Sequence, residues 1–192
     1  QMKFALLFLL LLAATAPAAA HPMHAPNQFD LLKQRRFAPF FWTQFLGAGN
    51  DNVFKNALII FAAFHAASMT TLDANALVNL AGAVFIAPFM LLSATAGQLA
   101  DKYEKSQLIR WIKVFEIAIM LIGLAGFWRH DLVLLLTALA LMGVHSTLFG
   151  PVKYAILPQH LKPDELIGGN GLVEMGTFVA ILLGTILGGL VV

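Results

Sequence analysis

The sequence predicts an all-α integral membrane protein, and its composition and hydropathy pattern support this assignment. Of the 192 residues, 59% are hydrophobic and only 11% are charged, and the mean hydropathy is +0.80. The apolar residues occur in long runs, several of them close to the ~20 residues that a helix needs to cross a bilayer. The chain contains no cysteine, which excludes disulfides, thiolate metal sites and cysteine nucleophiles.

Five membrane spans are predicted after residue 36. The fourth ends at Gly150-Pro151, which should break or kink the helix. The glycine run at 168–171 is too short and too badly placed for a phosphate loop, and predicts a turn or a helix start. The spans cover residues 37–64, 76–96, 108–127, 132–149 and 171–192.

The loop charges predict an orientation. Nine basic residues lie in three places: before the first span, around the loop that joins the second and third spans, and after the fourth span. The loops on the other side, residues 65–75 and 128–131, hold only Arg129. By the positive-inside rule, the side with nine is cytoplasmic, which places the start of the first span inside the cell. The net charge of +2 does not indicate a nucleic-acid partner, because the basic residues form no continuous patch. The nine are Lys33, Arg35, Arg36, Lys102, Lys105, Arg110, Lys113, Lys153 and Lys162.

Residues 1–22 conflict with this orientation. A lysine, an apolar run and an alanine-rich stretch resemble a secretory signal peptide, whose cleavage would leave Arg35 and Arg36 outside. The segment is an extra anchoring span, an addition made for expression, or a stretch upstream of a true start at Met23; we favour the last two. We interpret the neighbouring His21 and His24 as an incidental pair, and expect no metal site.

The first span has a polar centre. An unpaired charge at bilayer depth costs about 2.5–3.5 kcal/mol, so Asp51 and Lys55 indicate a polar interior and a candidate substrate pathway. Helical spacing puts Gln44, Gly47, Asp51 and Lys55 on one face, and Asp51 and Lys55 can neutralise each other. Asn50 and Asn52 add hydrogen-bonding groups at the same depth.

Further candidates lie in the later spans, and each has a structural alternative. Glu116 either faces a cavity or pairs with Lys113 one turn back. Lys153 either lies at the mouth of a cavity or only adds to the excess of basic residues on the cytoplasmic side. Tyr154 either forms a hydrogen bond with a head group or belongs to the aromatic belt at the membrane interface. His145 is either a proton relay or, as we favour, a packed neutral histidine.

The loop after the second span carries the most specific motif, Gly97-Gln-Leu-Ala-Asp101-Lys-Tyr-Glu-Lys. It resembles the signature of the major facilitator superfamily, although Glu104 replaces the usual glycine. Gly97 would allow close helix approach, and Asp101 would cap a neighbouring helix and pair with a basic side chain. The resemblance implies a gating latch made by Gly97, Asp101, Lys102, Lys105 and Arg110.

Three segments narrow the resemblance to the bacterial lysophospholipid transporter branch: residues 44–56, 150–158 and the stretch that begins at Glu174. The resemblance implies the N-terminal portion of a twelve-span fold, with most of its first six-helix half in residues 23–192. It also implies transport of a lysophosphatidylethanolamine-like lipid across the inner membrane by alternating access, with the C-terminal half elsewhere.

On this interpretation, a zwitterionic head group would place its ammonium at Asp51 and its phosphate near Asn50, Asn52, Lys55 or Lys153. Two alternatives stay open: transport of another amphiphile or drug, and the membrane domain of a fused lysolipid acyltransferase. No nucleophile–base pair, metal ligand set or nucleotide loop occurs in the sequence, so we expect no catalytic residue and no cofactor.

Overall fold

The computed structural model describes residues 27–190, apart from the side chains of residues 66–68. The signal-like segment, the His21–His24 pair and the proposed start at Met23 lie outside the described residues. Within residues 27–190 the chain is helical and has no strand, which confirms the predicted all-α class. The elements are η1 (Gln28–Lys33), α2 (Ala38–Met69), α3 (Ala74–Lys102), α4 (Lys105–Arg129), α5 (Leu132–Ala155), α6 (Leu157–His160) and α7 (Leu166–Leu190).

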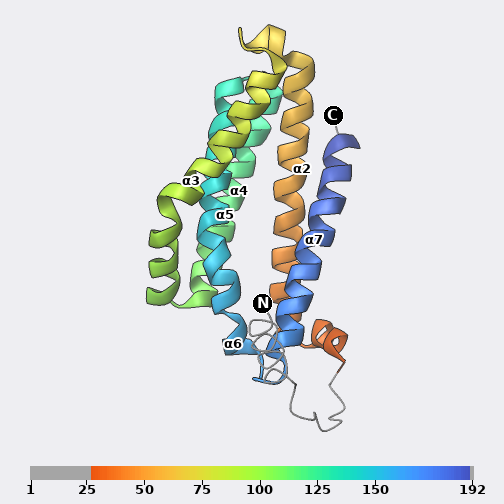
Figure 1. The fold of residues 1–192 in the computed structure, drawn as a ribbon, viewed down its shortest axis with the longest axis vertical. Coiled ribbons are helices and arrows are strands. Elements are labelled where there is room, and N and C mark those ends of the chain that lie inside the picture. Colours follow the sequence, from red (N-terminus) through yellow and green to blue (C-terminus); the bar gives the residue numbers. More distant parts are fainter. Residues whose placement is uncertain (1–26, 191–192) are drawn as a thin grey trace, which may run out of the picture.

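The five long helices form a bundle with two parts (Figure 1). α2 packs along α7, and α5 packs against both α3 and α4, while α2 also contacts α3 and α5. The α3–α4 connection, α6 and η1 lie together at the lower end of the bundle in Figure 1, whereas the α2–α3 and α4–α5 turns lie at the upper end.

Short acidic side chains explain where three of the long helices begin. Asp73 accepts a hydrogen bond from the backbone N–H of Ala76 at the start of α3. Glu104 and Asp131 each accept from two backbone N–H groups at the starts of α4 and α5. These bonds satisfy donors that a helix leaves unpaired in its first turn.

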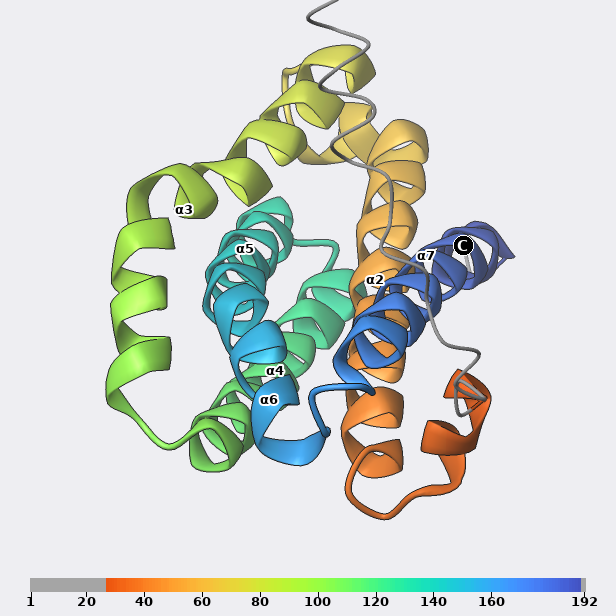
Figure 2. The same cartoon turned by 60° about the horizontal axis from the view of Figure 1, so that its bottom comes forward.

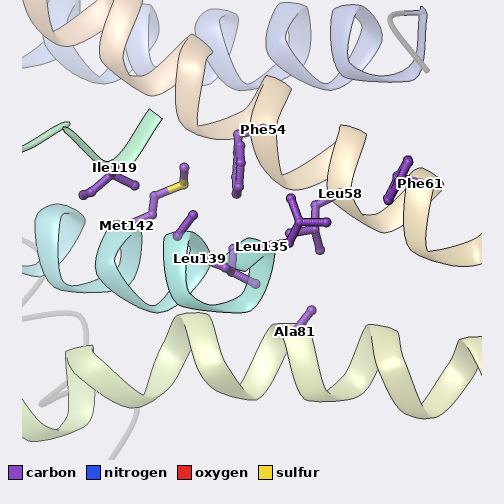
Figure 3. Close-up of a cluster of buried hydrophobic side chains, with 9 residues drawn as sticks. Phe54, Leu58, Phe61, Ala81, Ile119, Leu135, Leu139 and Met142 are labelled. Carbon is purple, nitrogen blue, oxygen red and sulfur yellow. The ribbon is translucent and has the colours of Figure 1, made fainter. Parts of the chain in front are cut away.

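The largest apolar core lies where α2, α3, α4 and α5 meet (Figure 3). Phe54 and Leu58 of α2 point toward α5, in which Met142 is 1% exposed. Ile119 comes from α4. Because Phe54 lies three residues after Asp51, this core begins directly beside the polar centre of α2.

α3 curves around α5, as Figure 2 shows. Pro88 lies inside α3 and cannot donate the backbone hydrogen bond of an ordinary helical residue, which favours a bend. On the concave side, Gly143 of α5 lies against the Phe85 carbonyl and the Pro88 ring. The missing side chain at Gly143 therefore permits the close α3–α5 contact.

The predicted spans correspond to the five long helices, with two differences. α5 continues through Pro151 to Ala155, so of the two expected effects of Gly150-Pro151 the break is wrong, and the kink stays a prediction. α7 begins at Leu166, so the glycine run at 168–171 forms its first turns. Within residues 27–190, three segments are long and apolar enough to cross a membrane: Ala74–Lys102, Leu132–His160 and Leu166–Leu190.

Candidate functional site

A cavity of about 300 Å³ lies between α2, α3, α5 and α7. The α2 residues that line it include Gln44, Gly47, Asp51 and Lys55, which confirms the face expected from helical spacing. Phe85 and Phe89 of α3 provide an apolar wall. The other lining residues are Ala48, Asn52, Lys113, His145, Ser146, Phe149, Gly150, Lys153, Thr177 and Ile181.

Asp51 keeps one oxygen without a partner. Ser146 Oγ donates a hydrogen bond to Asp51 Oδ2 at 3.1 Å, whereas Asp51 Oδ1 is buried and has no hydrogen-bond partner among the described residues. Lys55 does not form the expected ion pair with Asp51, because its Nζ lies over the Phe85 ring, 4.6 Å from the centroid. The cation–π contact stabilises Lys55 instead, and Asp51 retains an acceptor beside the cavity.

Glu116 joins α4 to α2 and α5. Lys113 Nζ donates to Glu116 Oε2 at 2.6 Å, and Asn50 Nδ2 donates to Glu116 Oε1 at 3.1 Å. His145 Nε2 of α5 lies 3.4 Å from Glu116 Oε2. Glu116 therefore pairs with Lys113, one of the two predicted alternatives. The Asn50 amide contacts Glu116, and a role of Asn50 at a head group stays a prediction.

A second polar group lies on the other side of the cavity, between α5 and α7. Lys153 Nζ donates to Glu174 Oε1 at 3.2 Å and to Thr177 Oγ1 at 3.3 Å. Tyr154 donates its hydroxyl proton to the same Glu174 oxygen. Thr177 in turn donates to Gln44 Oε1 at 3.1 Å. Lys153 thus lines the cavity with its charge paired, and Tyr154 lies at the exposed edge.

Asn52 lines the cavity, but its amide Nδ2 donates to the Ala48 carbonyl at 2.8 Å. Its side chain therefore keeps the amide oxygen and one N–H to offer a ligand. Together with Asp51, Lys55 and Lys153, it places four of the seven predicted binding residues at the cavity. Asn50 and Glu116 instead line a groove on the opposite side of α2, between α2 and α4.

Several members of the site were not predicted as binding residues, among them the polar side chains of Lys113, His145, Ser146 and Thr177. The three-residue spacing of Lys113 and Glu116 predicted an ion pair on α4, but it did not predict that the Lys113 ammonium would reach α2. The approach depends on Gly47, because the Lys113 ammonium lies directly against the position that a Cβ of Gly47 would occupy. Ser146 and Thr177 gave no sequence signal, since hydroxyl side chains are common in apolar helices.

The predicted gating motif is only partly as expected. Within residues 27–190, Gly97 has open space where its Cβ would lie, so the close helix approach expected there stays a prediction. Glu104, the residue that departs from the family pattern, caps α4, and these backbone N–H bonds from Ser106 and Gln107 lower its pKa. Asp101 is exposed and caps no helix among residues 27–190. The latch formed with Lys102, Lys105 and Arg110 stays a prediction.

The arrangement is thus a bundle of long apolar helices around a charged internal cavity. A family model described as Major Facilitator Superfamily matches residues 40–192. The chain belongs to the major facilitator superfamily. It is therefore a transporter-family protein of multi-pass membrane type, and the predicted superfamily assignment is confirmed.

Several curated relatives carry the name lysophospholipid transporter LplT. The chain is 32% identical over 108 residues to the protein of that name from Pectobacterium carotovorum, and 32% identical over 109 residues to that of Photorhabdus laumondii. Identity to the Yersinia pestis protein is 30% over 109 residues. Each match covers 55% of this chain but only 24–25% of the relative. The chain thus spans about a quarter of the relatives that it matches, and no solved structure matches it significantly.

Proposed function

We propose that this chain is the N-terminal part of a lysophospholipid transporter. The polar head group of the lipid would bind in the cavity beside Asp51. The observation that carries the proposal is the buried Asp51 Oδ1, which has no hydrogen-bond partner among the described residues, in a residue that lines a cavity of about 300 Å³. A buried carboxylate oxygen without a donor is costly, and the ammonium of a zwitterionic lipid would supply one. The names of the curated relatives support the choice of substrate class.

The cavity also offers groups for the phosphate of such a lipid. Among the described residues, the Lys55 ammonium contacts the Phe85 ring and forms no hydrogen bond, which leaves its protons available to an anion. Lys153 lies across the cavity and is paired with Glu174, so it would have to exchange that carboxylate for the phosphate. We therefore assign the ammonium to Asp51 and the phosphate first to Lys55.

The direction of the chain in the membrane is part of the same proposal. Arg36, Lys105 and Lys162 lie near the end of the bundle that holds η1, α6 and the α3–α4 connection (Figure 1). The positive-inside rule places this end in the cytoplasm. The substrate path would then run between this helical half and the remainder of the transporter, and would open alternately to the two sides.

The test uses the complete gene in cells that lack their own lysolipid uptake. Labelled lysophosphatidylethanolamine is followed from the outer to the inner leaflet, with the wild type beside Asp51→Asn. Loss of a charged hydrogen bond is worth about 1.5–3 kcal/mol, so the variant should move the lipid about tenfold to a hundredfold more slowly. Asp164→Asn is the matched control, because it makes the same change at an exposed position outside the cavity.

Each outcome separates the alternatives. Wild-type transport by Asp51→Asn, with the protein present in the membrane, would remove the head-group assignment. No lysolipid movement by the wild type would remove the lipid substrate and leave the superfamily assignment, and other amphiphiles and drugs would then be tested. A fused acyltransferase would be recognised in the complete gene by its own catalytic motifs.

A further inference from the structure

Three lysines line the candidate substrate cavity, and they differ in how many ammonium protons are left for a ligand. Lys153 donates two hydrogen bonds and lies against an aromatic ring, so its protons are in use. Lys55 donates none among the described residues. Lys113 donates one, to Glu116 at 2.6 Å, and its Nζ lies 4.6 Å from the Phe149 ring centroid. Lys113 therefore keeps a proton for a ligand, although the proposed head-group contacts do not use it.

Lys113 reaches the cavity through a gap in α2. Among the described residues of α4 it alone lines the cavity. Gly47 provides the gap, because the Lys113 ammonium lies where a Cβ of Gly47 would be. Glu116 holds the ammonium there, and Asn50 of α2 donates to the other carboxylate oxygen of Glu116. The charge of Lys113 is thus fixed at the cavity wall, in the place of a side chain of α2.

The Lys113 ammonium and Lys55 lie on opposite sides of Asp51 along α2. Gly47 comes one turn before Asp51 and Lys55 one turn after it, about 6 Å each way along the helix axis. In a phosphoethanolamine head group a short link joins the ammonium to the phosphate, so the two lie within about one helical turn of each other. A head group held at Asp51 by its ammonium can consequently direct its phosphate toward one lysine or the other.

We infer that the site has two alternative positions for the lipid phosphate, one at Lys55 and one at Lys113, with the ammonium at Asp51 in both. The inference rests on the proposed lysophospholipid substrate and adds Lys113 to the residues that bind it. Lys113 is suited to this role because charged donors bind phosphate oxygens more strongly than neutral donors do. Glu116 would keep its hydrogen bond from Asn50 while Lys113 contacts the phosphate.

The two positions would follow one another during transport. α2 begins at the end of the bundle that we assign to the cytoplasm, so Gly47 lies nearer that side than Lys55 does (Figure 1). A phosphate that enters from the outer leaflet would meet Lys55 first and Lys113 second. The head group would turn about Asp51 without losing its ammonium contact.

The test measures equilibrium binding to the purified complete transporter in detergent. The ligands are labelled lysophosphatidylethanolamine and a single-chain alkylamine, which has the ammonium and the tail but no phosphate. Gly47→Ala displaces the flexible end of Lys113 from the cavity and leaves Glu116, its partner on the same helix, in place. With two alternative positions, Gly47→Ala or Lys55→Gln alone should weaken lysolipid binding only about twofold, whereas the double variant should weaken it about tenfold.

Two further variants, each made in the Lys55→Gln background, complete the comparison. Gly49→Ala is the matched control, because its Cβ would make only an ordinary contact, at 3.8 Å from the Ala180 carbonyl, and Gly49 does not line the cavity. It should bind both ligands like Lys55→Gln alone. Lys113→Gln/Glu116→Gln removes the ammonium without leaving a carboxylate unpaired, and should weaken lysolipid binding as much as Gly47→Ala does. None of these changes beyond Lys55→Gln should weaken alkylamine binding.

Lysolipid binding by Gly47→Ala/Lys55→Gln equal to that by Lys55→Gln would overturn the second phosphate position. An equal loss of alkylamine binding would also overturn it, since the added methyl group would then narrow the cavity for any ligand. If the alanine variant does not fold, Lys113→Gln/Glu116→Gln in the same background decides by the same two comparisons. Asp51→Asn should weaken the binding of both ligands; unchanged binding there would contradict the proposed function itself, whatever the result at Gly47.

Discussion

Replacing Gly188 by alanine should separate α7 from α2, whereas the same change at Gly189 should not. A Cβ at Gly188 would lie 2.7 Å from the Val53 carbonyl oxygen and 2.8 Å from Asn56 Cβ, against an ordinary contact of 3.4 Å or more. The α7 backbone would have to move by about 0.6–0.7 Å along a seam that Gly184 also brings close. At Gly189 the Cβ would meet only the Ile60 side chain at 3.8 Å, which is ordinary contact.

Overpacking of this kind costs about 1–3 kcal/mol, and alanine returns up to about 1 kcal/mol of helix propensity at either position. Gly188→Ala should therefore be less stable by about 1–2 kcal/mol, and Gly189→Ala as stable as the wild type or slightly more so. The assay is thermal unfolding of the purified protein in one detergent, where each kcal/mol shifts the midpoint by about 2–4 °C in a unit of this size. Equal midpoints for the two variants would refute the close α2–α7 seam.

Two further predictions concern ion pairs. Lys113→Met should destabilise the protein by about 3 kcal/mol, because it leaves the buried Glu116 carboxylate without the lysine ammonium. Adding Glu116→Gln should restore most of that loss, which a double-mutant cycle measured by thermal unfolding would show. Additive losses of stability in the two single variants would contradict the pairing. The Arg36 hydrogen bond lowers the pKa of Glu165, so this pair stabilises the fold above the ordinary pKa of 4.5 and the stabilisation disappears as the pH falls below it. The unfolding midpoint of Glu165→Gln should consequently fall less between pH 6 and pH 3 than that of the wild type, and parallel curves would show that another group is responsible.

The sequence was sufficient to predict the helices and one face of the site. Long apolar runs fix the number of long helices, and the 3.6-residue period alone places Gln44, Gly47, Asp51 and Lys55 on one side of α2. Both predictions depend on local geometry, which a single helix determines by itself. The two boundary errors, at Pro151 and at the start of α7, arise where tertiary packing extends a helix past residues that would end an isolated one.

The partners across the helices could not be predicted, because each depends on how a neighbouring helix is rotated. Asp51 and Lys55 have the spacing of an ion pair, yet Ser146 of α5 and Phe85 of α3 are the groups that reach them. The rotation of α5 that presents Ser146 depends in part on the contact of Gly143 with the bend of α3. Glycine positions of this kind determine which faces meet, and their consequences become visible only when both helices are present.

α2 lies between the proposed substrate cavity and the groove that α2 forms with α4, and Gly47 has no side chain to separate the two spaces. Gly47 and Lys113 line both spaces, and the Lys113 ammonium occupies the room that a side chain at Gly47 would take. A phosphate in the cavity would attract that ammonium in competition with Glu116. Because Asn50 of α2 also donates to Glu116, such competition would act on the contact between α2 and α4.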